Sequence, residues 1–389
     1  MRAHIDYEGV AEFFTLGFTL NGKTMIKGVP CPRFHFPYVE PDGKATVKDF
    51  VEALDSAVEK CIKPNVAIAL SGGIDSRIIA GLVARHDRNV CTYTFGDSSL
   101  EKTIAGKVSA VLGLKHYEIT DNMFLTESSL EPLQIFLKKI GGVMDILNAQ
   151  YEIGLTHSLK KIGIKSIMGG WLFEVVNGSW SLRNIASTKA FCQTMISNSN
   201  VYVPCEYKAI TLKNLTKACE GYSFREALIH VLAFNSRPDL SHAGVLRQIH
   251  PLADRDVLRC LLSLPYELTV AKHLQREILR KHFPQLNRIP YATSLLPPSL
   301  PLTLHLAIRK AVRLLYNHLG LQSPNPLLTN DTPFYLRNNI TFIHRILFEN
   351  DLPPMFTRNI VSKLYENLSD ANCLLLLRGA TYNMIKDVV

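Results

Sequence analysis

Residues Val66-Ala67-Ile68-Ala69-Leu70 lead directly into Ser71-Gly72-Gly73-Ile74-Asp75-Ser76. The first five are apolar and predict a buried strand, and an amphipathic helix is expected to begin at Asp75. A loop of this composition gathers backbone N–H groups, hydroxyls and a helix N-terminus around one small concavity, which attracts phosphate. Glycine lets the ligand approach the backbone closely because it carries no Cβ. The stretch therefore predicts a phosphate or pyrophosphate site at the end of a strand.

Asp75 places a carboxylate inside this predicted anion site, where it would repel a phosphate. A Mg²⁺ ion held by Asp75 would bridge the phosphate oxygens and remove that repulsion. The loop lacks the Gly-x-x-x-x-Gly-Lys-[Ser/Thr] pattern of the Walker P-loop. We therefore expect a nucleotide site of another type, and a strand–turn–helix corner without a ligand is the alternative.

The overall composition limits the class of protein. A chain of 389 residues with 47% hydrophobic and 20% charged residues is typical of a folded globular protein of one large or two ordinary domains. The segment Met1–Glu8 has no apolar run, and no stretch is long enough to span a bilayer, so we expect a cytoplasmic protein without a membrane partner. The eight cysteines include no Cys-x-x-Cys pair and are expected to be free thiols. The net charge of +9 is spread along the chain without a nucleic-acid motif, so no nucleic-acid partner is expected.

Apolar strands alternate with amphipathic helices between residues 63 and 185, which predicts βαβ units and a parallel sheet. Ligands of such sheets bind at the carboxyl ends of the strands. The loop at 71–76, Phe95-Gly96-Asp97 and Gly169-Gly170 are therefore expected to meet at one site. Strands are expected at 66–70, 89–95, 115–119 and 165–168, and helices at 47–61, 75–86, 101–112 and within 128–162.

The chain is expected to divide into three parts. Residues 1–62 are a leading segment, residues 63–185 the nucleotide-binding α/β core, and residues 186–389 a largely helical region. In the leading segment we expect a short helix near Val10–Phe14, three short strands and a second helix. The three short strands are expected at 18–20, 24–26 and 33–36. The predicted fold class is α/β, with a parallel doubly wound sheet and a helical C-terminal region.

The Ser-Gly-Gly-x-Asp-Ser loop at 71–76 resembles the PP-loop of the HUP-like ATP pyrophosphatases, which split ATP into AMP and pyrophosphate. Other stretches resemble the synthetase half of the asparagine synthetase family. They are Glu12–Phe18 with Ile26–Val29, Thr94-Phe95-Gly96, Glu101 with Ala105, Leu114–Ile119, Gly163–Gly169, and His250–Leu258 followed by Leu264-Pro265. The resemblance covers nearly the whole chain, and residues 1–62 resemble a remnant of the family's glutaminase domain and its connector.

This resemblance implies an ATP-dependent carbon–nitrogen ligase. It would activate a carboxylate, aspartate by family default, as an acyl-adenylate and pass the acyl group to ammonia or an amine. The implied cofactors are ATP and Mg²⁺. The implied site residues are Ser71, Gly72, Gly73, Asp75 and Ser76 for pyrophosphate, Leu70, Phe95 and Gly169 for adenosine, and Asp75 and Glu174 for the metal and catalysis.

The chain departs from the family pattern at the predicted reaction centre. Met1-Arg2 stands in place of the N-terminal cysteine nucleophile, so we expect no glutaminase activity and a separate glutaminase, an amine-donor protein or free ammonia as the nitrogen source. Gly170 replaces an expected carboxylate, and Phe173 replaces the aspartate that would bind the metal. Glu174 either turns inward to replace that ligand or faces solvent. The loop at 288–294 lacks the lysine that the family offers to pyrophosphate.

Several basic side chains have two interpretations. Lys281, Arg280 or Arg288 would replace the missing lysine, or they are surface charges. Arg77 would contact phosphate or lie exposed at a helix N-terminus, and His116 would act as a base or be a satisfied histidine at the start of a strand.

The losses also leave two other functions open. One is a catalytically degenerate nucleotide-binding pseudoenzyme that regulates a partner protein. The other is RNA modification through an adenylated base, which rests only on the loop and the basic charge.

Overall fold

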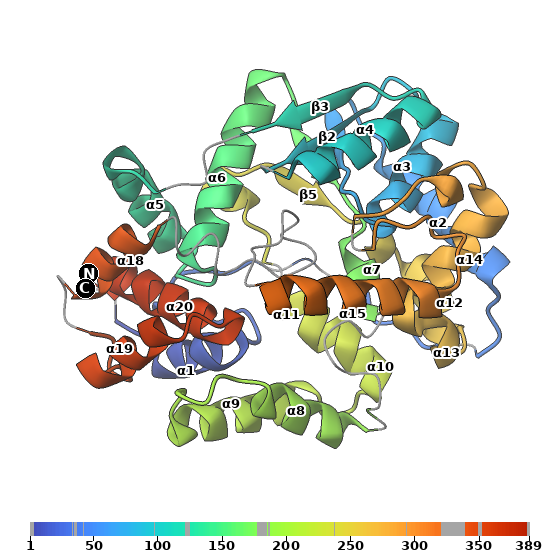
Figure 1. Ribbon diagram of the computed structural model, residues 1–389. Coiled ribbons are helices and arrows are strands. Elements are labelled where there is room, and N and C mark those ends of the chain that lie inside the picture. Colours follow the sequence, from blue (N-terminus) through green and yellow to red (C-terminus); the bar gives the residue numbers. More distant parts are fainter. Residues whose placement is uncertain are drawn as a thin grey trace.

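The fold was analysed in a computed structural model of the chain (Figure 1). It describes residues 4–32, 34, 37–41, 43–96, 98–120, 125–176, 185, 187–236, 238–292, 294–319, 339–348 and 352–386. The side chains of residues 174–176, 234, 309, 313 and 316–319 lie outside this description.

The centre of the fold is a parallel sheet of five strands in the order β3-β2-β1-β4-β5. The four strands predicted from the sequence are confirmed. A fifth, β5, comes from the region expected to be helical, where three residues give too short a pattern to detect. The strands are β1 Val66–Ala69, β2 Cys91–Phe95, β3 His116–Ile119, β4 Ser166–Met168 and β5 Arg247–Ile249.

Helices cover both faces of the sheet, as Figure 1 shows. Alternate side chains of β1 separate the two faces, since Ile68 packs in the core with α2 and α3, whereas Ala67 packs against Leu155 and Leu159 of α6. This arrangement confirms the predicted α/β fold with a doubly wound parallel sheet. The helices around the sheet are α2 Val47–Cys61, α3 Asp75–His86, α4 Ser99–Leu112, α6 Ile146–Lys161, α7 Trp171–Val176, α12 Arg255–Ser263 and α14 His273–His282.

A second hydrophobic core joins the two ends of the chain, because α1 Tyr7–Leu16 packs against α20 Asp370–Lys386. The helices α5 Glu127–Lys139, α18 Ile340–Phe348 and α19 Arg358–Glu366 complete it. The boundaries at 62 and 185 stay predictions, and the sheet itself extends past the second one through β5.

The strands predicted at 18–20 and 24–26 are wrong, since these residues form only an isolated antiparallel bridge between Ile5 and Ile26. Glu12 of α1, which is fully buried, accepts hydrogen bonds from Leu20 N at 2.8 Å and Lys23 Nζ at 3.2 Å. These bonds hold the loop against α1 instead of in a hairpin, and burial raises the pKa of the Glu12 carboxyl. Most of the third predicted strand, 33–36, lies outside the described residues.

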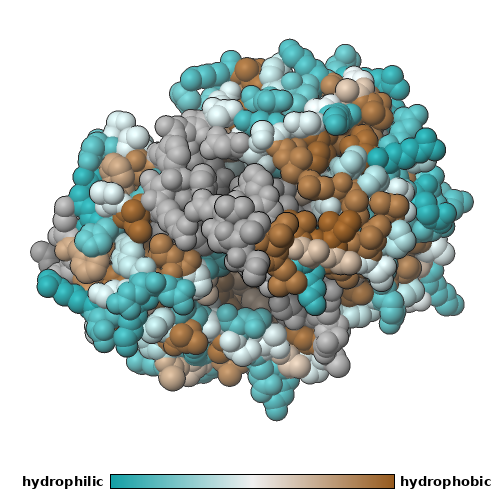
Figure 2. All heavy atoms as spheres, viewed as in Figure 1, coloured by the Kyte–Doolittle hydropathy of each residue, from teal (hydrophilic) through white to brown (hydrophobic). Residues whose placement is uncertain are grey.

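The region after the core is largely helical, as predicted. In the described part of the chain, no helix combines the length and the apolar character needed to cross a membrane. All eight cysteines are free thiols. In the same view as Figure 1, Figure 2 shows apolar side chains gathered on the face that α15 crosses. The exposed large apolar residues of α15 include Leu304, Leu306, Leu314 and Leu315. The remaining elements are α8 Thr188–Ser197, α9 Cys205–Ala218, α10 Phe224–Ala227, the π-helix η1 Leu228–Ala233, α11 Phe234–Ser236, η2 Ser241–Ala243, η3 Pro251–Ala253, α13 Tyr266–Thr269, η4 Val270–Lys272, η5 Leu286–Arg288 and α15 Leu302–Leu319.

Candidate functional site

A cavity of about 350 Å³ lies at the carboxyl ends of the strands, between the sheet and α6. Its floor is formed by small residues, Ala69 at the end of β1 and Gly169 just after β4, which leave room beneath the helix. Larger side chains stand on either side of this gap, with Phe95 of β2 at one side and His250 after β5 at the other. The sequence thus builds a slot by placing its smallest residues on the central strands.

The loop at 71–76 borders the slot and is held by its own hydroxyls. Ser71 N donates to Ser76 Oγ at 3.1 Å, the two Oγ atoms lie 3.0 Å apart, and Gly73 N donates to Ser71 Oγ at 3.2 Å. The helix α3 begins directly after it, and its N-cap residue Ile74 makes no side-chain capping bond. The first turn of α3 therefore presents N–H groups that no side chain caps, which is the arrangement that binds an anion.

Gly72 is required by packing as well as by any ligand. A Cβ at this position would lie 2.7 Å from the Cβ of Ala292, whose backbone N donates to Gly72 O at 3.0 Å. On the other side, the Gly72 N–H donates to the Glu101 carboxylate. Burial raises the pKa of Glu101, and this hydrogen bond opposes the shift. The loop is therefore fixed between α4 and the segment around residue 292.

Arg77 has neither of its two predicted roles. Its side chain is fully buried and donates to five backbone carbonyls, which belong to Gly72, Gly73, Leu286, Ile289 and Pro290 at 2.8–3.3 Å. Burial lowers the pKa of the Arg77 guanidinium to about 10. Because these bonds join the loop to residues 286–290, Arg77 holds the loop in place and does not line the cavity.

Lys272 supplies a cation at the site that the sequence reasoning missed. Its Nζ lies 2.8 Å from Asp75 Oδ2 and forms an ion pair with it. Ala271 and Lys272 have φ values of +53° and +64°, a left-handed conformation that is unfavourable for residues other than glycine. The strained turn before α14 brings Lys272 to the loop, although the two paired residues are 197 positions apart in the sequence. No local sequence pattern could therefore have identified this lysine.

The second oxygen of Asp75, Oδ1, is buried and has no hydrogen-bond partner among the described residues. A buried carboxylate oxygen needs a partner, and Mg²⁺ carried by a nucleotide phosphate is one that fits. In the described part of the chain, no group of three or more His, Cys, Asp or Glu side chains is arranged so that it could hold a metal ion. The remaining ligands of such an ion would therefore include phosphate oxygens and water.

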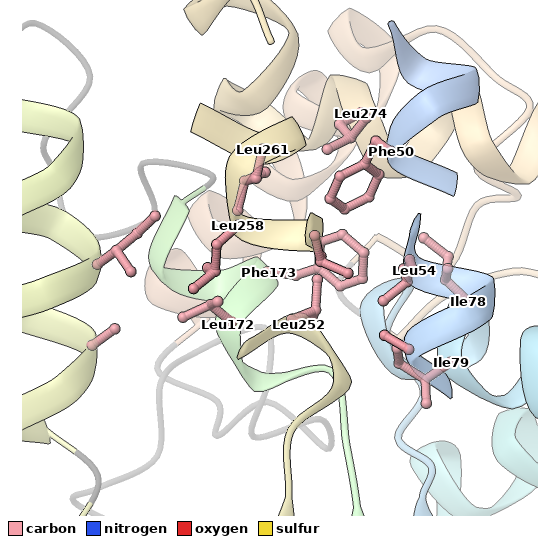
Figure 3. Packing of buried hydrophobic residues seen from close by; sticks show 14 of the residues in the cluster. Phe50, Leu54, Ile78, Ile79, Leu172, Phe173, Leu252, Leu258, Leu261 and Leu274 are labelled. Carbon is pink, nitrogen blue, oxygen red and sulfur yellow. The ribbon is translucent and has the colours of Figure 1, made fainter. Parts of the chain in front are cut away.

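Phe173, at the position of the expected metal-binding aspartate, points into the hydrophobic core. It is fully buried, and its ring packs edge-on against Phe50 with centroids 6.1 Å apart. Figure 3 shows it among Leu54, Leu252 and Leu258. Gly170 lies close to α3, where a Cβ would stand 3.1 Å from the backbone carbonyl atoms of Asp75. Position 173 therefore serves packing, and close approach to α3 favours glycine at position 170.

The structure brings together most of the predicted ligand-binding residues. Leu70, Phe95 and Gly169 line the cavity with Ser71, Asp75 and Ser76. The ring of Phe95 packs edge-on against Tyr151 of α6 at 4.5 Å between centroids. Glu174 belongs to α7, and the predicted role of its side chain lies outside the described residues, as does Asp97. The assignments of these residues to pyrophosphate, adenosine and metal stay predictions.

The other basic candidates lie away from the reaction centre. Arg280 and Lys281 both pair with Glu277 on the surface of α14, and Arg288 is exposed. His116 begins β3 at the opposite edge of the sheet, where its Nδ1 hydrogen-bonds with Thr92 Oγ1 at 2.8 Å. Of the interpretations of His116, that of a satisfied histidine is confirmed.

A family model of asparagine synthase matches residues 49–128. Residues 49–128 are therefore asparagine synthase-like. This segment contains the loop at 71–76 together with most of α2, all of α3 and α4, and the first three strands of the chain, so the predicted resemblance is confirmed there. Gly170, Phe173 and Lys272 lie outside it.

A search of curated proteins finds none that matches this chain. The solved structure of NMN synthetase from Francisella tularensis is similar at 14% identity, covering 56% of this chain and 92% of that chain with a TM-score of 0.24.

Proposed function

We propose that this protein is an ATP-dependent ligase that forms AMP and pyrophosphate while activating a carboxylate for amide-bond formation. The asparagine synthase match at residues 49–128 supports ATP-dependent amide-forming chemistry at the level of the family. One observation carries the proposal for this chain. The uncapped start of α3 and Asp75, whose Oδ1 has no partner among the described residues, border one cavity large enough for a small-molecule ligand, and the Lys272 ammonium pairs with the same Asp75.

The chemistry has two steps. In the first, an oxygen of the substrate carboxylate attacks the α-phosphorus of ATP, and the bond from that phosphorus to the bridging oxygen breaks, so that pyrophosphate leaves with the electron pair. In the second, an amine or ammonia attacks the acyl carbon and AMP leaves. Negative charge grows on the pyrophosphate during the first step, and cations placed in advance stabilise it. Mg²⁺ held by Asp75 would supply part of the positive charge that stabilises the leaving pyrophosphate.

The residues of this chain have separate tasks in the proposed reaction. Ser71, Gly73 and Ser76 would shape the pocket for the leaving pyrophosphate, and the α3 N-terminus would bind its oxygens. Lys272, paired with Asp75 Oδ2, would place a second positive charge near the phosphates, while the unpartnered Oδ1 would hold the metal. Phe95 and Gly169 would enclose the nucleoside.

The test is exchange of labelled pyrophosphate into ATP with Mg²⁺, using aspartate and a panel of other carboxylates. We expect exchange that depends on one carboxylate and falls by at least about 100-fold in Asp75→Ala, since the variant loses metal and charge stabilisation of the transition state. Asp256→Ala, which removes an exposed aspartate of α12, is the matched control and should retain exchange. Exchange that persists in Asp75→Ala would contradict the assigned role of this residue.

A second candidate function, a nucleotide-binding regulatory protein without turnover, is favoured by Phe173 and Gly170. Neither position offers a carboxylate to the cavity, and Phe173 belongs to the core. Under this alternative the protein binds ATP tightly, shows no exchange with any carboxylate in the panel, and keeps its partner in Asp75→Ala. ATP affinity measured beside exchange separates the two candidates.

A further inference from the structure

The cavity has an unusual charge for a site that would hold a nucleotide and a carboxylate. Three carboxylates line it, on Asp75, Glu101 and Glu152, and none of the described lining residues is a lysine or an arginine. Anionic ligands would be repelled unless cations accompany them. Lys272 pairs with Asp75, and the Gly72 N–H donates to Glu101. Glu152 is the lining carboxylate that the proposed nucleotide site does not use.

Glu152 lies in the roof of the slot and has only 6% of its surface exposed. It belongs to α6, and its Oε1 accepts from Gln248 Nε2 of β5 at 3.4 Å, a long hydrogen bond. It is close enough to Tyr93 that the pKa of that buried hydroxyl is raised first by burial and further by Tyr151 and Glu152. The carboxylate is therefore held inside the cavity by the sheet below it.

Because Glu152 bonds to Gln248 of β5, its carboxylate lies on the β5 side of the slot. The strand order β2-β1-β4-β5 places β5 two strands beyond β1 on one side, whereas Phe95 ends β2 on the other side of β1. The proposed nucleoside subsite at Phe95 thus leaves the β5 side for another molecule. His250 and Trp171 form an aromatic wall there, with their ring centroids 5.2 Å apart. Aromatic faces beside a carboxylate are favourable to a cation.

Resting on the proposed ligase function, we propose that the acyl acceptor is an organic amine bound on the β5 side of the cavity, and that Glu152 accepts its proton. A protonated amine gives one proton to a Glu152 oxygen and becomes nucleophilic. Its nitrogen then forms the bond to the acyl carbon, while the carbon–oxygen bond to AMP breaks and AMP leaves with the electron pair. The second N–H proton passes to solvent.

This role also accounts for a departure in the sequence. Gly170 stands where a carboxylate is expected after β4, and it borders the same cavity as Glu152. The close approach of Gly170 to the Asp75 backbone favours a residue without a side chain there. The structure thus offers a carboxylate from the opposite wall, on α6, in place of the one missing from the loop.

The experiment compares the two half-reactions in the whole chain and in Glu152→Gln, which keeps the size of the side chain and its ability to accept from Gln248. Carboxylate-dependent ATP–pyrophosphate exchange reports the first step. Transfer to ammonium, primary alkylamines and diamines reports the second, and hydroxylamine, which is neutral at pH 7.5, reports acyl transfer that needs no proton acceptor. We expect exchange and hydroxamate formation within about threefold of wild type, but transfer to alkylamines reduced about 100-fold, the size typical of a general base. Glu131→Gln, at an exposed position of α5, is the matched control.

The outcomes separate this inference from the proposed function. Absence of exchange in the wild-type chain with every carboxylate overturns the ligase proposal and this inference with it. Exchange with equal amine transfer in wild type and Glu152→Gln overturns the inference alone, as does a preference for ammonium over every organic amine. A loss of ATP affinity in Glu152→Gln would instead assign the carboxylate to the adenine amino group. If Glu152→Gln lost both exchange and folding, Gln248→Met would be tested in its place. Weakened amine transfer with retained exchange in Gln248→Met would support the inference, and unchanged amine transfer would overturn it.

Discussion

Two segments of the chain follow neighbouring parallel strands and border the same cavity, yet they differ in chemistry. The loop at 71–76 after β1 keeps its polar groups, and its hydroxyls bond within the loop. The segment at 169–173 after β4 carries two glycines and Trp171, which line the cavity, and then Leu172 and Phe173, whose side chains pack in the core (Figure 3). One edge of the sheet thus combines a polar loop with a segment whose last two side chains pack in the core.

A segment at the carboxyl edge of the sheet can border the cavity, but its side chains decide which chemical groups it presents there. The loop at 71–76 is stabilised by residues that face away from the ligand, above all Arg77. The segment at 169–173 lacks the expected carboxylates, and the charged group that joins the loop from elsewhere in the chain is a cation, since Lys272 approaches Asp75 from the start of α14. Substitutions in these regions should therefore affect folding and catalysis separately.

Placing the carboxylate that the family pattern has at position 173 should have the largest effect, and it tests whether the segment at 169–173 serves packing. In Phe173→Asp a charged group would replace a fully buried ring beside Phe50, which combines a cavity with an unpaired buried charge. We expect a loss of more than about 4 kcal/mol in the free energy of unfolding, enough to prevent stable folding. Urea denaturation measures it, and Phe173→Leu, which keeps an apolar side chain, should cost only about 1–2 kcal/mol. A well-folded Phe173→Asp that bound Mg²⁺ more tightly would show that this segment faces the cavity.

Removing the guanidinium of Arg77 should have the next largest effect. Arg77→Met would leave backbone carbonyls of two segments without their donor, and we expect a loss of about 3 kcal/mol in the free energy of unfolding. Arg85→Met, on the same helix but partly exposed, should cost less than about 1 kcal/mol. Equal losses in the two variants would contradict a bridging role for Arg77.

The sequence predicted the sheet and the loop well because local patterns specify them. Alternation of strands and helices and the glycine-rich turn lie within short windows, and α2 and α3 have the predicted bounds. The burial of Arg77 and the approach of Lys272 depend on residues about 200 positions apart, so no local pattern contains them. The short strands predicted at 18–20 and 24–26 are wrong for the same reason, since the buried Glu12 carboxylate binds that loop from α1. Local signals thus gave the framework of the candidate site, while its cations came from tertiary contacts.

Lys272→Met tests the cation that local patterns could not reveal. The Asp75–Lys272 pair is partly exposed, so we expect little change in the free energy of unfolding, less than about 1 kcal/mol. Carboxylate-dependent pyrophosphate exchange should fall by about 10- to 100-fold, because one preplaced charge near the leaving group is lost. Lys281→Met removes a lysine suggested by the sequence that pairs with Glu277 on the surface, and it should leave exchange unchanged. The reverse ranking of the two variants would assign the missing cation to Lys281.

Substitution of His116 should have the smallest effect of these variants. His116 begins the edge strand β3, away from the cavity, so its substitution should change stability and not ligand binding. Burial lowers the pKa of this imidazole from its ordinary value of 6.5, so the folded state holds it neutral. Below pH 6.5 the unfolded chain then binds more protons than the folded one. The contribution of the neutral His116 to the free energy of unfolding is complete above pH 6.5 and is lost as the pH falls toward the lowered pKa of His116 in the folded state. Urea midpoints at pH 8 and pH 5.5 should differ less in His116→Gln than in wild type, while ATP affinity at pH 8 stays the same in both. An equal pH dependence of the midpoints would mean that other histidines, such as the partly buried His230 and the buried His305, whose pKa values burial also lowers, account for all of it.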